Sequence, residues 1–284
     1  MRDLFDKEII TIDDMMNLIK SFNDDVGSVP YGFILTTECF EIIRCSLSTE
    51  YSFNNGVTDI TFYSYPLLIS DIWCNKMNCS FACVNKEIYD KAYKEQRKID
   101  VAKKNKLQRI DKFKILFKDF EYIGTKSIDE VIEYLDNTGY FDAPASTKYH
   151  GDYIGGLFDH SYVVTSSLLD LTEKLELKWE RSISPYIVGM FHDLCKCDDY
   201  IYDPNEEKFK HRDNLILNGH GEKSVIMAQK LIDLTNEEIA CIRWHMGAYD
   251  DKENWNILGR AIEEYPNVLY THTADMIATR IRGI

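Results

Sequence analysis

The sequence predicts an α+β protein of two domains: an all-α helical domain over residues 143–284, preceded by a mixed α/β domain over residues 1–142. Residues 31–80 are rich in tyrosine, phenylalanine, isoleucine, valine and threonine, which favour strands. From residue 161 onward, apolar residues instead recur at three- and four-residue spacings, as on one buried helix face. All seven histidines lie at or after residue 150, so metal or acid–base chemistry is expected in the second domain.

In the first domain, residues 12–22 predict a short amphipathic helix that begins after Thr11 or Asp13. Residues 31–80 predict a small antiparallel sheet, with Asn54-Asn55-Gly56 as a turn.

The segment Lys86 to Lys118 has 12 basic and five acidic residues, and it contains no proline or glycine. Apolar residues are interleaved with the charges, which predicts a long helix with a basic face. Such a face has two interpretations. It is a solvated surface on an acidic protein, which is the favoured reading, or it guides a single-stranded nucleic acid or an acidic partner.

The second domain begins with a connector and continues as helices. An amphipathic stretch from Ile128 to Leu135 is followed by Ala143-Pro144-Ala145-Ser146-Thr147, where proline stops helix propagation. Helices are then predicted near residues 161–176, 185–191, 221–231, 236–245 and 266–281. No convincing alternating strand pattern occurs, so this domain is expected to be all-α.

Composition and charge restrict the class of protein. The net charge of −14, from 33 basic and 47 acidic residues, opposes indiscriminate binding to nucleic acids or anionic lipids. No apolar run reaches the roughly 18 residues of a membrane span, and the first residues lack a secretory signature, so a cytoplasmic protein without a membrane partner is expected. The eight cysteines are then expected to be reduced, buried thiols.

Several potential metal ligands occur at predicted helix termini or on apolar faces. An unpaired polar group is costly there unless it is hydrogen-bonded or coordinated. By itself, the pair His192-Asp193 is equally well explained as a buried histidine beside a capping aspartate. The whole set, however, provides four imidazoles and two carboxylates for one or two divalent ions, namely His160, His192, Asp193, His220, His245 and Asp275.

The order His160, His192-Asp193, Asp275 resembles the H…HD…D signature of the HD-domain metal-dependent phosphohydrolases. The segments from Gly155 to Ser161 (GGLFDHS) and from His192 to Lys196 (HDLCK) are similar to that family's GGLLEHS/T and HDIGK motifs. The resemblance covers about residues 140–282. The run from Tyr149 to His160 is particularly similar to the branch that contains bacterial 3′-to-5′ exoribonucleases and related phage hydrolases.

This resemblance implies a role for each matching residue. It implies one or two divalent ions (Mn, Fe, Co, Ni or Mg), with His160, His192, Asp193 and Asp275 at the first, and His220 and His245 at a second that Asp193 bridges. Trp244-His245 stands where many binuclear relatives have two adjacent histidines. Asp193 and Lys196 would be catalytic, with Lys196 beside the leaving phosphate. The substrate contacts would be Lys148, His150 and Lys196.

The expected function is metal-dependent hydrolysis of a phosphate ester in a nucleotide or short oligonucleotide by a metal-activated water. Three alternatives stay open: a 3′-to-5′ exonuclease on single-stranded RNA or DNA that uses the basic segment, a cyclic-nucleotide phosphodiesterase, and a non-catalytic HD scaffold that acts through partner binding. Among the other residues, His211 is expected to be solvated and His272 to lie in the core or behind the ligands. Lys223 and Arg280 are further candidates for phosphate contacts.

Overall fold

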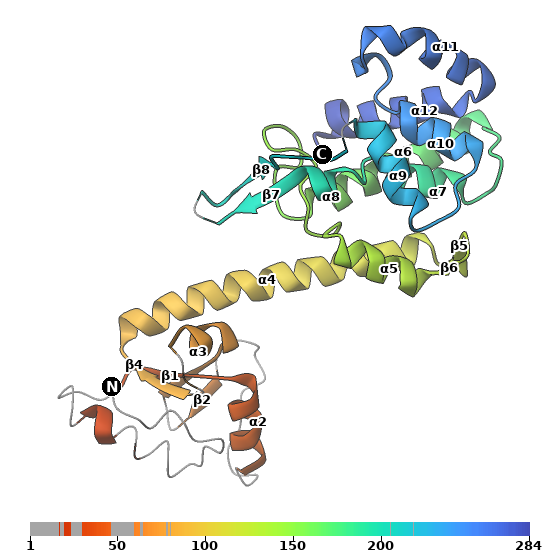
Figure 1. The fold of residues 1–284 in the computed structure, drawn as a ribbon. Coiled ribbons are helices and arrows are strands. Elements are labelled where there is room, and N and C mark those ends of the chain that lie inside the picture. Colours follow the sequence, from red (N-terminus) through yellow and green to blue (C-terminus); the bar gives the residue numbers. More distant parts are fainter. Residues whose placement is uncertain are drawn as a thin grey trace. The chain divides into compact units, whose positions relative to one another are not determined.

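A computed structural model describes residues 17, 20–23, 30–46, 60–62, 65–77, 79, 81–204, 206–217 and 219–284. The chain divides into two compact units, residues 1–102 and residues 103–284, whose elements are labelled in Figure 1. The second unit therefore begins well before residue 143, where the sequence predicted a boundary. The aromatic residues Phe113, Phe117, Tyr140 and Phe141 account for this difference, because they belong to the hydrophobic core of the second unit.

The first unit contains a mixed four-stranded sheet in the order β2-β3-β1-β4. The strands are β1 (Gly32–Leu35), β2 (Ile60–Phe62), β3 (Tyr65–Ile69) and β4 (Phe81–Val84). Strand β1 pairs antiparallel with β4 but parallel with β3, where Phe33 lies opposite Leu67. The predicted all-antiparallel sheet is therefore wrong at this pair.

Helices within the aromatic-rich stretch explain the parallel pair. Helix α2 (Thr37–Ser46) follows β1, and helix α3 (Asp71–Met77) separates β3 from β4. Parallel neighbours require such a crossover rather than a tight turn. The expected turn at residues 54–56 and most of the expected helix at residues 12–22 lie outside the described residues, although residues 17 and 20–23 are helical.

The predicted basic helix is confirmed as α4 (Lys86–Leu116). Its first part contributes Tyr89 and Ala92 to the hydrophobic core of the first unit. Its last part contributes Phe113 to the core of the second unit.

The second unit is mainly helical, and the helices predicted from periodicity are confirmed. They are α5 (Ile128–Asn137), α6 (Gly156–Leu175), α7 (Ser184–Phe191), α9 (His220–Gln229), α10 (Asn236–Trp244) and α12 (Asn267–Met276), which continues as the π-helical segment η3 (Ile277–Arg282). The remaining elements are β5 (Tyr122–Ile123), β6 (Lys126–Ser127), α8 (Lys196–Asp199), the short 3-10 helices η1 (Gly247–Tyr249) and η2 (Lys252–Asn254), and α11 (Trp255–Glu264). No helix among the described residues is both long and apolar enough to cross a lipid bilayer.

The second unit also contains an antiparallel hairpin, so the expectation of an all-α domain is wrong for residues 200–211. Strand β7 (Tyr200–Asp203) pairs with β8 (Lys208–His211). Neither strand alternates between buried and exposed residues. The hairpin consequently lacks the period-two pattern by which a half-buried strand is recognised in a sequence.

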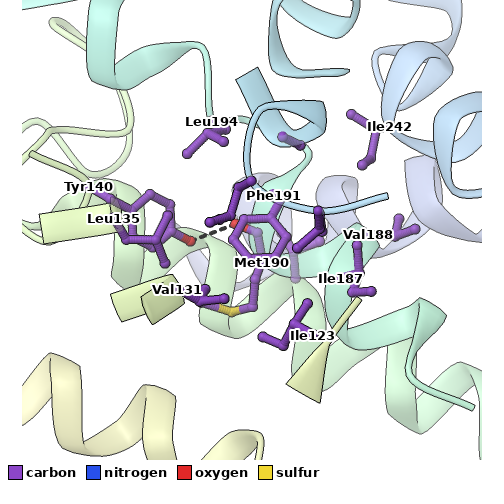
Figure 2. Close-up of a cluster of buried hydrophobic side chains, with 14 of the residues drawn as sticks. Ile123, Val131, Leu135, Tyr140, Ile187, Val188, Met190, Phe191, Leu194 and Ile242 are labelled. Carbon is purple, nitrogen blue, oxygen red and sulfur yellow. Dashed lines mark hydrogen bonds between the residues drawn. The ribbon is translucent and has the colours of Figure 1, made fainter. Parts of the chain in front are cut away.

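Helix α7 lies at the centre of the second unit. It is apolar on all sides, and Figure 2 shows its residues from Ile187 to Phe191 among the buried side chains of neighbouring elements. The buried Tyr140 hydroxyl donates a hydrogen bond of 2.6 Å to the Met190 carbonyl (Figure 2). Helix α6 packs closely on α7, since a Cβ atom at Gly189 would lie 2.4 Å from the Thr165 hydroxyl oxygen. Because α7 ends at Phe191, the pair that follows it, His192-Asp193, is held inside the unit.

Candidate metal centre

Three buried histidines have their Nδ1 atoms bonded to backbone oxygens. His192 Nδ1 lies 2.8 Å from the Gly189 carbonyl, and His245 Nδ1 lies 2.8 Å from the Ile242 carbonyl. His160 Nδ1 lies 3.0 Å from the backbone oxygen of the residue at position 284. A carbonyl oxygen only accepts hydrogen bonds, so each Nδ1 carries the proton and donates. In the neutral ring, each Nε2 atom then presents its lone pair, as in histidines that bind metals.

These Nε2 atoms converge on two carboxylates. His160 Nε2 lies 3.2 Å from His192 Nε2, and the two atoms lie 3.5 and 3.4 Å from Asp193 Oδ2. His160 Nε2 also lies 3.4 Å from Asp275 Oδ1. The other Asp193 oxygen, Oδ1, lies 3.4 Å from His245 Nε2. Asp193 therefore faces different histidines with its two oxygens, which is the arrangement expected of a bridging carboxylate.

The donor atoms fit a cation. Ligand atoms at 2.0–2.2 Å from one ion, at angles between 90° and the tetrahedral value, are separated by roughly 2.8–3.6 Å, which includes the 3.2–3.5 Å separations found here. Within the described part of the chain, His245 Nε2 and Asp193 Oδ1 are buried without a hydrogen-bond partner. Lone pairs that face each other in a buried site repel unless a proton or a cation lies between them.

Both carboxyl groups are held in the ionised form. Burial opposes ionisation of Asp193, but the charge of Lys196 holds the pKa of Asp193 well below its usual value. Burial likewise opposes ionisation of Asp275, but a proton on the neighbouring His160 imidazole lowers the pKa of Asp275. The cluster thus presents carboxylates, the form that binds cations.

Lys196, a predicted catalytic and substrate-binding residue, lies within this cluster. Its side chain is 10% exposed, and its Nζ atom lies 2.5 Å from Asp193 Oδ2. Burial acts to lower the Lys196 pKa, but the Asp193 carboxylate outweighs it and raises that pKa. The ammonium group is therefore charged and paired with Asp193.

His220 lies apart from the other candidate ligands, in the first turn of α9. Its potential ligand atom groups with those of Asp193 and Cys195, all within 4.8 Å of one another. Sequence reasoning interpreted Cys195 only as a buried thiol. One signal could have singled it out, since Cys195 occupies the position of glycine in the HDIGK motif that the sequence resembles.

The predicted substrate residues lie in the loop before α6. The His150 ring is centred 5.3 Å from the His160 ring. Burial and the nearby His160 and Lys196 lower the His150 pKa to about 4, so this ring is neutral at pH 7. Lys148 is exposed in the same loop.

The remaining candidates have different surroundings. His272 donates from Nδ1 to the His245 carbonyl over 2.8 Å, so it helps to position the backbone of a candidate ligand. His211 is exposed as predicted, at the end of strand β8. Lys223 is buried, and its ammonium group contacts Asp198 at 2.7 Å and Asp199 at 2.6 Å. The predicted role of Lys223 in phosphate contacts is therefore wrong. Arg280 is exposed on η3.

Sequence reasoning counted Arg109, which is buried, among the residues of the basic face of the long helix. Arg109 of α4 donates from Nη2 to the Ile154 carbonyl over 2.8 Å, and Nη2 lies 3.5 Å from Asp159 Oδ2. Its guanidinium packs over Gly155, where a Cβ atom would lie 2.0 Å from Arg109 Cζ. Arg109 thus fixes the turn that leads into α6, the helix that carries His160.

Comparisons of the chain with family models, with curated proteins and with solved structures find no match.

Proposed function

We propose that the chain is a metal-dependent phosphohydrolase of the HD-domain type, acting on a phosphate ester of a nucleotide or short oligonucleotide. One observation carries this proposal: three buried imidazoles, each with Nδ1 bonded to a backbone oxygen, direct Nε2 at the ionised Asp193 and Asp275. Lys196 compensates one of the two carboxylates, and a bound cation would compensate the other and satisfy the imidazole nitrogens that face them.

His160, His192, Asp193 and Asp275 would hold the first ion, and the second oxygen of Asp193 is placed to share a further ion with His245. A divalent ion bound there supplies an acidified water as the nucleophile and neutralises phosphoryl oxygens.

The protein's own groups contribute orientation and charge. The backbone carbonyls that accept from Nδ1 fix the ring planes, so the Nε2 lone pairs need no reorganisation when an ion binds. The Lys196 ammonium provides a fixed positive charge at the same carboxylate, close to where a phosphate would enter. The neutral His150 is placed beside His160 to exchange a hydrogen bond with a substrate oxygen.

The charges on α4 favour a small substrate over a long strand. Several of its basic side chains pair with the protein's own carboxylates: Lys86 with Asp90, Lys106 with Asp136 and Asp142, Arg109 with Asp159, and Lys114 with Asp129. A cation already paired releases fewer counterions on binding phosphate. This pairing favours the interpretation of the helix as a solvated surface. Nucleotides are therefore the first substrates to test.

The direct test is hydrolysis of a substrate panel in the presence of Mn²⁺, with mononucleotides, cyclic dinucleotides and labelled single strands. We expect turnover of a nucleotide that EDTA abolishes. Asp275→Asn removes a ligand without unpairing Lys196, and we expect it to lower turnover by at least 100-fold. His211→Ala is the control, because His211 is exposed and outside the cluster.

Turnover that survives EDTA or Asp275→Asn would contradict the proposal. Hydrolysis restricted to single strands would instead support the exonuclease alternative, and ion binding without turnover of any substrate would support the scaffold alternative.

A further inference from the structure

We propose that Cys195 is a metal ligand, and that with His220 it completes the further site at the Asp193 oxygen facing His245, as a site for a borderline ion such as Zn²⁺, Co²⁺ or Fe²⁺. The inference deepens the proposed function, on which it rests through the shared Asp193. A sulfur ligand selects such ions over Mg²⁺, which prefers oxygen ligands.

The separations of the donor atoms carry the inference. Cys195 Sγ lies 3.2 Å from His220 Nδ1. For a metal–sulfur distance of 2.3 Å and a metal–nitrogen distance of 2.1 Å at a right angle, the two ligand atoms are separated by about 3.1 Å. The Asp193 carboxylate completes the group within 4.8 Å. Three ligand types therefore face one small volume.

Burial gives an independent reason to assign a ligand role to this thiol. Cys195 is fully buried, and its sulfur lies within hydrogen-bond distance of His220 Nδ1 and groups with the Asp193 carboxylate. Asp193 Oδ1 is buried without a hydrogen-bond partner among the described residues. A cation between these groups would satisfy the carboxylate and the sulfur together.

The surrounding contacts hold the two ligands in place. The Cys195 backbone N–H donates to Ser224 Oγ of α9 over 3.1 Å, which ties the turn after Asp193 to the helix that carries His220. At the start of α9, a Cβ atom on Gly221 would lie 2.0 Å from the Arg243 carbonyl oxygen of α10. Helix α9 is therefore held to the Cys195 backbone through Ser224 and to α10 at Gly221. The backbone, and not only the side chains, thus determines the separation of Cys195 from His220.

Binding requires no redox step. The Cys195 thiol loses its proton to solvent, and the sulfur lone pair forms the bond to the ion. The site then differs from an all-histidine and carboxylate centre by one negative charge and by a polarisable donor.

Titration of the metal-free full chain with Co²⁺ tests the inference by absorption spectroscopy. A thiolate bound to Co²⁺ gives a near-ultraviolet charge-transfer band, whereas nitrogen and oxygen ligands give visible bands only. We expect this band in the wild type and its loss in Cys195→Ser, with the visible bands retained and Zn²⁺ affinity of the second site lowered at least tenfold. Cys197→Ser, in the same turn but outside the group, is the matched control and should keep the band.

Each other result has a defined meaning. Visible bands without a charge-transfer band in the wild type, or a band that persists in Cys195→Ser, would overturn the inference and leave the proposed function intact. Absence of any Co²⁺ binding would overturn both. Circular dichroism of each variant separates loss of the ligand from loss of the fold, and Cys195→Ala provides a second substitution if the serine variant unfolds.

Discussion

Asp193→Ala removes the carboxylate that links the histidines with Lys196, and its effect on stability follows from the pairing of that lysine. Both side chains are almost fully buried, with Asp193 4% and Lys196 10% exposed, and their charged atoms lie 2.5 Å apart. The alanine substitution leaves the Lys196 ammonium buried without its partner. The metal-free fold should therefore weaken, in addition to losing a proposed ion ligand.

The expected loss is about 3 kcal/mol, at the lower end of the 3–5 kcal/mol measured when one partner of a buried pair is removed, because the lysine retains slight contact with water. For a folded unit of 150–250 residues, that loss corresponds to a fall in Tm of roughly 6–12 °C. Adding Lys196→Met removes the unpaired charge and should restore most of this stability.

Thermal unfolding in EDTA, monitored by circular dichroism, measures the stability of the wild type, the two single variants and the double variant. We expect a coupling energy of about 2 kcal/mol between the two positions. With Mn²⁺ at 100 times its Kd, the wild type should gain about 2.7 kcal/mol and Asp193→Ala almost none. A metal-free Asp193→Ala as stable as the wild type, or a coupling near zero, would refute the reasoning about Lys196.

Two further predictions concern packing and pairing in the second unit. Gly189→Ala should lower the free energy of unfolding by about 2 kcal/mol, since the added Cβ would lie 2.4 Å from a Thr165 oxygen; an unchanged urea midpoint would show that α6 and α7 separate freely. Arg181→Met should cost about 2 kcal/mol, because two Arg181 nitrogens donate to the fully buried Glu238 carboxylate. The exposed Arg260→Met is the control for the second variant, and equal urea midpoints for the two would count against the pairing.

The sequence predicted the helices and the grouping of the histidines with the two aspartates for a shared physical reason. Helices of the second unit bury one face, so their apolar spacing is visible in the sequence, and α7 is visible as an uninterrupted apolar run. A histidine or carboxylate at the end of such a run must lie near the core. His160, His192, Asp193, His245 and Asp275 were identified from that position.

The features that sequence reasoning missed depend on contacts between distant segments. Nothing local in Gly32–Leu35 distinguishes a strand with a parallel neighbour from one with antiparallel neighbours only. Arg109 lies among exposed lysines along the chain, and only its contact with Ile154, 45 residues away, separates it from them. Cys195 and His220 are likewise 25 residues apart, so their proximity could not be read from spacing.

The charges of the cluster predict the order in which the proposed ion and the proposed nucleotide substrate would bind. Asp193 and Asp275 contribute two negative charges and Lys196 one positive charge, so these three side chains sum to about −1 on a chain of −14. A nucleotide phosphate should be repelled by this cluster, whereas one divalent ion changes the local charge to about +1. We therefore expect a nucleotide to bind only after the ion, with calorimetry detecting no nucleotide binding in EDTA and measurable binding in Mn²⁺. Equal affinity under both conditions would place the nucleotide site away from Asp193 and Asp275.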